Sequence, residues 1–309
     1  MSSIGRREWI AGVLCAGAAW PARPQGELIE SHVHLFADDV VRFPFANGGA
    51  GRQSYPVEKF LAFANEAKID HAVIVTPEPY QDDHRYLEYC LERAPSKGFF
   101  RSSCLFDPID RRTPQRMGEL VKRTGGAVAA LRIHEMHEPG TPSTTTGAIR
   151  DRDLRDPQMA VCWRAAGDLG LMIQMHFIPH YAPQIGELAA KFRNTPVLLD
   201  HLARAGHGTP ADYDEVLKLA DLPRVYMKYS GTGVTASSKQ AYPHLDAKPI
   251  VRRALEAFGA DRMVWGELGN SMPNFEKALE LFDIMFDFAS EADRAKIRGL
   301  TAKKLFGFI

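Results

Sequence analysis

The chain has 309 residues with 38 basic and 38 acidic side chains, so its formal net charge at pH 7 is zero. This balance gives no reason to expect a nucleic-acid or membrane-surface partner. The 4 cysteines, of which Cys15 lies near the N-terminus, have no paired spacing. We therefore interpret them as small buried residues and expect neither a disulfide framework nor a zinc knuckle.

The N-terminal segment has the features of an export signal. Arg6 and Arg7 precede a weakly apolar stretch that ends near Ala19 and is followed by Pro21. This stretch is shorter than the roughly 20 residues that span a bilayer. We expect residues 1–25 to be a twin-arginine-type signal peptide with a short spacer, and the protein to be periplasmic or secreted. A frayed or helical extension is the alternative.

Beyond residue 25, apolar strand-like runs alternate with amphipathic helical stretches. Strands are expected over residues 28–35, 71–76, 99–106, 127–134, 171–175, 197–200, 225–229 and 263–265. Helices are expected over residues 57–67, 84–93, 114–123, 157–169, 185–192, 211–220, 250–258, 275–288 and 291–305. This alternation predicts an α/β fold, a single (β/α)8 TIM barrel over residues 26–309 with an extra C-terminal helix.

Two long irregular stretches, residues 37–55 and 135–153, each follow a predicted strand. Loops after the strands of a barrel lie over its mouth, where long loops usually carry substrate contacts. For residues 144–147, an ordinary mobile surface loop is an equally good interpretation.

Histidines gather at the predicted strand ends. His32 and His34 are two residues apart in the first strand, so their side chains share a face. Alone this pair is weak evidence, because such pairs also occur as ordinary buried or surface residues. His176 and His201, however, follow two later strands. The carboxyl ends of parallel barrel strands converge on one mouth, so the four histidines predict a site there.

Several segments together resemble a known family. The chain is similar to the amidohydrolase-related family of metal-dependent barrel hydrolases, and most of all to its lactonase branch, which includes 2-pyrone-4,6-dicarboxylate lactonase. The segments that carry the resemblance are Glu30–His34, Asp83–Leu87, Trp163–Gly170, Asp200–Leu202 and Arg204, Lys228–Gly231 and Leu305–Phe308.

The resemblance implies that His32, His34 and His176 are ligands of one divalent metal ion, most simply zinc, with His201 close by as a catalytic residue. Imidazole suits zinc, and a catalytic site needs about three protein ligands and an open position. The ion would lower the pKa of a bound water and polarise the scissile carbonyl. A metal-free site remains an alternative, because the dicarboxylate lactonase works without a bound metal.

One position departs from the family pattern. Members usually carry an Asp after the eighth strand, whereas this chain has Leu268 there, preceded by Gly266 and Glu267. By strand alternation Glu267 lies on the face of Trp265 and points away from the mouth, but a bulge could turn it inward. Glu267 is therefore our candidate catalytic carboxylate, with a buried structural or rim glutamate as the alternative.

Three cationic residues are candidates for substrate binding. Arg132 interrupts an apolar strand and needs an anionic partner, which could be Glu30, Asp200 or a substrate carboxylate. The resemblance favours a substrate carboxylate for Arg204. Lys228 is the third candidate, and a buried network under the site is the ordinary alternative for it.

Some apparent motifs are discounted. His134-Glu135-Met136-His137 is one residue short of the zinc-protease motif and follows a strand, and Gly231–Ala236 matches a dinucleotide fingerprint outside any Rossmann unit. His180, His207 and His244 lie in polar loops and are assigned no role.

The sequence thus predicts a hydrolase that opens a carboxylated lactone or similar cyclic ester with metal-activated water. The alternatives are a non-oxidative decarboxylase of an aromatic or unsaturated acid, a metal-independent lactonase, and a non-catalytic binding protein that retains the pocket. The expected partner is a small carboxylate-bearing molecule, and a homo-oligomer is left open.

Overall fold

The structure is a computed structural model that describes residues 26–46, 53–143 and 145–309. The expected signal peptide, residues 1–25, lies outside the described residues. Within the described part of the chain, no helix is both long and apolar enough to cross a membrane.

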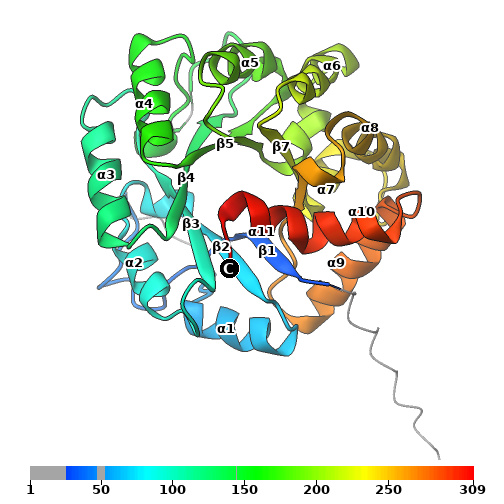
Figure 1. Cartoon of the computed structure of the whole chain (residues 1–309), viewed down its shortest axis with the longest axis horizontal. Helices are drawn as coiled ribbons and strands as arrows, with labels where there is room; N and C mark the ends of the chain where they lie inside the picture. Colours follow the sequence, from blue (N-terminus) through cyan, green and yellow to red (C-terminus); the bar gives the residue numbers. More distant parts are fainter. Residues whose placement is uncertain (1–25, 47–52, 144) are drawn as a thin grey trace, which may run out of the picture.

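Eight parallel strands form one sheet in the order β1 to β8, and helices surround the ring of strands (Figure 1). The strands are β1 Ile29–Val33, β2 His71–Val75, β3 Phe100–Leu105, β4 Val128–Glu135, β5 Met172–Phe177, β6 Val197–Leu199, β7 Val225–Tyr229 and β8 Met263–Trp265. Each strand pairs with the next in sequence, which is the connectivity of a (β/α)8 barrel. The predicted fold is confirmed.

The helices agree with the expected pattern, with two differences. They are α1 Val57–Glu66, α2 Arg85–Glu92, α3 Thr113–Arg123, α4 Pro157–Asp168, α5 Ala182–Lys191, α6 Pro210–Lys218, α7 Gly231–Ser237, α8 Lys248–Phe258, α9 Met272–Met285, α10 Glu291–Ala295 and α11 Thr301–Phe306. A π-helical turn, Lys296–Leu300, separates α10 from α11 where one helix was expected. Helix α7 was not expected, because its glycines lower helix propensity; the Ser230 side chain caps it by accepting the Gly233 N–H.

Side chains help to close the barrel between β1 and β8. Ser31 Oγ donates a hydrogen bond of 2.7 Å to the Trp265 carbonyl. The buried Glu30 carboxylate accepts the backbone N–H groups of Glu267 and Leu268 at 2.8 and 2.6 Å. Glu30 therefore binds the backbone of the β8 end and is not the partner of Arg132.

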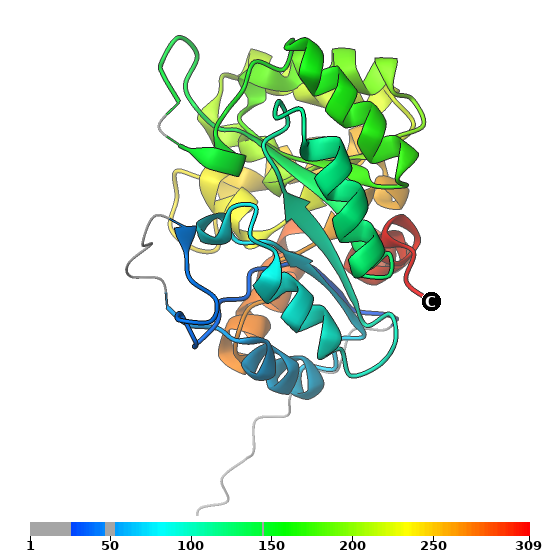
Figure 2. The ribbon, with the colours of Figure 1, turned by 90° about the vertical axis from the view of Figure 1, so that its left-hand side faces the viewer.

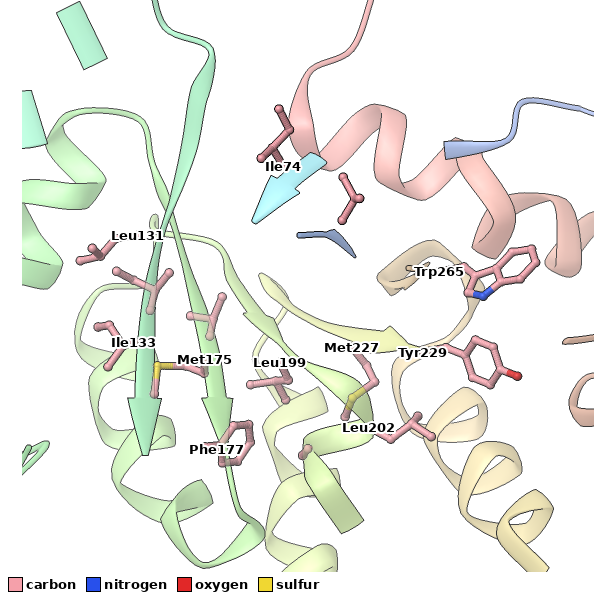
Figure 3. Packing of buried hydrophobic residues seen from close by; sticks show 14 of the residues in the cluster. Ile74, Leu131, Ile133, Met175, Phe177, Leu199, Leu202, Met227, Tyr229 and Trp265 are labelled. Carbon is pink, nitrogen blue, oxygen red and sulfur yellow. The ribbon is translucent and has the colours of Figure 1, made fainter. Parts of the chain in front are cut away.

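The outer faces of the strands carry the main hydrophobic core. Leu131, Ile133, Met175, Phe177 and Trp265 are buried against the surrounding helices (Figure 3). Burying a side chain of this size contributes about 1.5–3 kcal/mol each. The intervening residues of β4 and β5 face the barrel interior, so strand alternation separates the core from the site.

The C-terminal residues close the opposite end of the barrel from the site. Ala302, Phe306 and Phe308 belong to one buried cluster with Ile29, Val73 and other inward-facing strand residues. In Figure 1, α11 lies across the opening of the ring of strands. This end is filled with apolar side chains.

The other end carries the long segments that follow the strands. Residues 37–55 and 135–153 were expected there, and their described parts project from the left-hand side in Figure 2, away from the C-terminus. Phe36 and Tyr55 pair in an isolated antiparallel bridge, so the end of the first segment lies beside its start, close to the end of β1. In its described part after β4, residues 136–143 and 145–153, the second segment is irregular except for a short 3-10 turn, Gly147–Ile149.

Candidate active site

The histidines predicted at the strand ends lie together at the barrel mouth. His32 Nε2 and His34 Nε2 are 3.2 Å apart, and the ring centroids of His32 and His201 are 4.5 Å apart. The ring centroid of His176 is 5.5 Å from that of His201, and the ring centroid of His134 is 5.1 Å from that of His176. The pairing of β1 with β2 is irregular between Glu30 and Val33, in the stretch that contains His32 and directly precedes His34.

Burial keeps these imidazoles neutral. It lowers the pKa of His34 and of His201 to about 4, and it lowers the pKa of His32 and of His176 well below the ordinary value. Nearby cations, Arg132 among them, act in the same direction. A neutral imidazole keeps a lone pair that can accept a hydrogen bond or bind a metal ion.

The backbone after β6 adopts an unusual conformation that positions His201 and Arg204. His201, Leu202, Ala203 and Arg204 have φ angles of 55°, 54°, 53° and 51°, all in the left-handed region. For non-glycine residues this conformation costs roughly 1–2 kcal/mol each. Strain of this kind is typical of functional sites that the surrounding structure holds in place.

Helix α7 supports this strained turn. His201 Nδ1 lies 2.8 Å from Ser230 Oγ at the start of the helix. A Cβ atom at Gly233 would lie 2.6 Å from the His201 carbonyl oxygen, so only glycine allows this close approach. The site thus depends on a contact between the β6 and β7 connections that sequence alone did not reveal.

Asp200 is the centre of a buried polar network. Its carboxylate lies 3.0 Å from Arg132 Nε and 2.9 Å from Lys228 Nζ, and it accepts the Gln174 side-chain amide at 2.9 Å. Burial would raise the pKa of Asp200, but Lys228 and Arg132 together hold that pKa well below its ordinary value. Asp200 is thus the internal partner of Arg132. Lys228 belongs to the same buried network, which was the alternative to a role of Lys228 in substrate binding. Their predicted contacts with substrate stay predictions.

Glu267 is turned into the mouth, as the candidate role requires. Its φ angle of 66° departs from strand geometry, and its Oε2 accepts the Thr232 N–H at 2.9 Å. Oε1 lies 3.6 Å from His201 Nδ1. Burial alone would raise the pKa of Glu267, but His201 and the Thr232 N–H outweigh it and lower that pKa. Leu268, at the family's Asp position, is fully buried in the hydrophobic core.

Arg204 reaches the same centre from the left-handed turn. Its Nη2 and Nε atoms lie 3.0 and 3.3 Å from His176 Nε2. In the described part of the chain, no carboxylate oxygen lies within ion-pair distance of the Arg204 guanidinium. Burial lowers the pKa of Arg204 without removing its charge. The guanidinium therefore faces a neutral ring and has positive charge to offer an anion.

A cavity of about 680 Å³ opens at the part of the mouth formed by the ends of β1 and β8. His32, His34 and Glu267 line its inner wall. Its outer wall comes from the segments after β1, β7 and β8 and from α1 and α9, with the following residues: Tyr55, Lys59, Tyr242, His244, Asn270, Asn274 and Lys277. Its volume lies in the range of small-molecule sites.

The donors at the mouth fit a metal ion in part. One buried group, His32, Asp200 and His201, has its ligand atoms within 4.8 Å of one another, and a second consists of Glu78, His134 and His176. The predicted ligands are thus divided, with His34 beside the first group and His176 in the second. Two neutral imidazoles and a carboxylate suit zinc or manganese. Lys228 and Arg132, however, already neutralise Asp200.

Glu78 and His134 are the site residues that sequence reasoning missed. Glu78 Oε1 lies 3.4 Å from His134 Nε2, and this contact with His134 lowers the pKa of Glu78 to about 2. A usable signal existed for His134, because it is two residues after Arg132 in the same strand and so shares its inward face. None marked Glu78, which lies in a 3-10 turn after β2.

Comparison with known families agrees with this geometry. The profile of the family described as Amidohydrolase matches residues 29–308, nearly all of the barrel. The chain therefore belongs to the Amidohydrolase family. No curated protein matches the chain.

Three solved structures illustrate the range of similar proteins. A probable 2-pyrone-4,6-dicarboxylic acid hydrolase from Acinetobacter baumannii with citric acid bound has a TM-score of 0.72 and 18% identity, with 91% of this chain and 100% of that chain covered. An amidohydrolase from Burkholderia multivorans with bound zinc has a TM-score of 0.69 and 18% identity, covering 92% and 100%. A dihydroxybenzoic acid decarboxylase from Polaromonas with bound manganese has a TM-score of 0.60 and 15% identity, covering 91% and 97%. At these identities the likeness shows the fold.

Proposed function

We propose that the protein is a hydrolase that opens a lactone or similar cyclic ester bearing a carboxylate. The observation that carries this proposal is the Arg204 guanidinium, which is held at the site without a carboxylate partner among the described residues. A guanidinium in this setting favours a bidentate carboxylate of the substrate. The bound citric acid in the similar Acinetobacter protein supports the same ligand class.

Hydrolysis is assigned to Glu267 and the histidines. Glu267 lies on the cavity wall with an ionised carboxylate, so it takes a proton from the attacking water. The water oxygen bonds to the lactone carbonyl carbon, and the developing negative charge on the carbonyl oxygen is stabilised by an N–H of His32 or His201. The ring C–O bond then breaks, and the departing oxygen receives the proton. The product is a ring-opened hydroxy acid.

A divalent ion, when bound, would polarise the carbonyl and lower the pKa of the attacking water. We propose that His32 and His201 would hold it, with Asp200 as the third member of their group and His34 adjacent. The zinc and manganese in the similar structures support a metal in this family. We propose zinc, and elemental analysis tests it with a His32→Ala, His34→Ala variant as the control. Metal that is absent from the wild-type protein even after incubation with divalent ions would favour the metal-independent route.

The decisive test of the reaction class is product mass. Incubation with a panel of carboxylated lactones should give a product heavier by one water molecule. Loss of carbon dioxide from an aromatic or unsaturated acid would instead establish the decarboxylase alternative. Binding without turnover across both panels would make the protein a binding protein.

Two variants test the assigned roles once a substrate is found. Glu267→Gln should lower kcat by about 10²–10⁴-fold, the usual effect of removing a general base. Glu138→Gln, an exposed glutamate in the segment after β4, is the control and should leave kcat unchanged. Arg204→Met should raise KM for the carboxylated lactone far more than for its uncharged ester, and equal effects on both would contradict the carboxylate role.

We also propose that the protein is exported. The proposal rests on the paired arginines and the short apolar stretch of residues 1–25. Intact-mass analysis of the protein from a host with twin-arginine export should show loss of this segment, and an unshifted mass would refute cleavage.

A further inference from the structure

A second polar cluster lies outside the active-site cavity, at the end of β4. Glu135 is the last residue of this strand, His137 follows two residues later, and Asp151 returns from the segment between β4 and α4. One ligand atom from each residue lies within 4.8 Å of the others. His137 and Asp151 line a separate cavity of about 450 Å³.

Glu135 is the unusual member of the cluster. Its side chain is 0% exposed, and its Oε2 has no hydrogen-bond partner among the described residues. The other oxygen, Oε1, accepts the Arg152 N–H at 3.0 Å. A buried carboxylate oxygen without a partner is costly unless a proton or a cation satisfies it.

Among the described residues, no side-chain cation is hydrogen-bonded to Glu135 Oε2. The Arg152 guanidinium pairs with Asp107, through Nε at 3.0 Å. Burial, together with the charge of Asp151, raises the pKa of Glu135 to about 8. The Glu135 and Asp151 carboxylates thus lie in one cluster with the His137 ring. His137 Nδ1 lies 3.7 Å from Asp151 Oδ1.

The remaining contacts hold the cluster ready for a ligand. Asp151 accepts Ser143 Oγ at 2.8 Å, and the Met136 N–H also bonds to it. The Tyr181 hydroxyl lies 2.9 Å from His137 Nε2. These partners orient His137 and Asp151, and both residues line the cavity, where water can complete a coordination shell.

We propose that Glu135, His137 and Asp151 form a second site, which binds a divalent transition-metal ion such as Zn²⁺ and ties both ends of the segment after β4 together. One imidazole and two carboxylates favour Zn²⁺ or Mn²⁺ over Ca²⁺, which prefers oxygen ligands alone. The site is separate from the proposed catalytic centre, and its role is to hold the segment in place. It does not depend on the proposed lactonase activity.

Zinc binding to the full-length protein tests the proposal. After removal of metal with a chelator, Zn²⁺ is titrated by calorimetry into the wild type, Glu135→Gln and Glu138→Gln. Glutamine at position 135 still accepts the Arg152 N–H but is a poor metal ligand, whereas Glu138 is exposed in the same segment. Glu135→Gln should bind one Zn²⁺ fewer than Glu138→Gln. Because only the difference counts, the result is independent of metal at the barrel mouth.

A second pair of variants covers the case in which Glu135→Gln does not fold. His137→Ala should also bind one Zn²⁺ fewer than the wild type. His180→Ala, which alters the same cavity but is not one of the three proposed ligands, should bind as much Zn²⁺ as the wild type. Equal zinc stoichiometry in all variants, or no zinc bound by the wild type, would overturn the site and leave Glu135 as a protonated acid.

Limited proteolysis provides a readout of the segment itself. Arg150 is exposed next to the cluster, so trypsin should cleave after it at a rate set by local opening. Saturating Zn²⁺ should slow this cleavage by at least about tenfold in the wild type and leave it unchanged in His137→Ala. Equal protection of both proteins would contradict the proposal.

Discussion

The two ends of the barrel interior are built on opposite principles. The closed end, at α11, is apolar, with Phe306 and Phe308 packed against inward-facing strand residues such as Val73. The mouth is polar although equally buried: Arg132 is 1% exposed, and Asp200 and Lys228 are 0% exposed. Close packing of apolar side chains stabilises the closed end. At the mouth, ion pairs offset the free-energy cost of burying charged side chains. The difference shows that the barrel can devote one end to stability and the other to chemistry.

The largest expected effect comes from removing the charge that holds the mouth together. Asp200→Asn leaves Arg132 and Lys228 buried without their carboxylate, so the free energy of unfolding should fall by about 3–5 kcal/mol, with loss of activity. Urea unfolding measures the change. The control is Asp214→Asn, which breaks an exposed ion pair with Arg253 and should cost about 1 kcal/mol or less. Similar losses in both variants would contradict the network.

The next effect tests the closed end. Phe306→Ala removes a buried ring and should cost about 3 kcal/mol of unfolding free energy through cavity formation. The folded fraction should retain wild-type kcat and KM, because the ring lies at the end of the barrel away from the mouth. Ile309→Ala, at an 86% exposed position, should change stability by less than about 0.5 kcal/mol. A large loss of kcat in Phe306→Ala would show that the two ends are coupled.

A smaller effect separates positioning from stability at the mouth. Gly233→Ala places a methyl group against the His201 carbonyl, so it should cost about 1–3 kcal/mol and lower kcat by displacing His201. Thermal unfolding and kinetics measure the two effects.

The matched control is Gly118→Ala inside α3, where a Cβ meets only Leu169 Cδ2 at 3.7 Å. This change should stabilise the protein by about 0.5–1 kcal/mol, because alanine loses less conformational entropy than glycine in a helix. Opposite signs for the two glycines are expected. A stabilised, fully active Gly233→Ala protein would show that the close contact does not position His201.

The sequence by itself determined the barrel and the face of each strand. Alternating apolar runs set which residues enter the core, and that pattern also placed His32, His34, His176 and His201 at one mouth. It left the direction of Glu267 open, because strand alternation pointed this side chain away from the mouth, whereas Gly266 before it allowed an inward turn.

Only the tertiary structure decided how these residues group. From the sequence, both Glu30 and Asp200 were candidates for the ion-pair partner of Arg132. In the structure Glu30 binds the backbone where β1 and β8 meet, and Asp200 pairs with Arg132 beneath the mouth. The left-handed turn that aims His201 and Arg204 has no local sequence signal, since it is held by α7 from another strand connection. Sequence periodicity determines on which face of its strand each side chain lies. The distances between side chains of different strands depend on how the barrel closes and on the backbone conformation of the loops, and both are set by long-range packing.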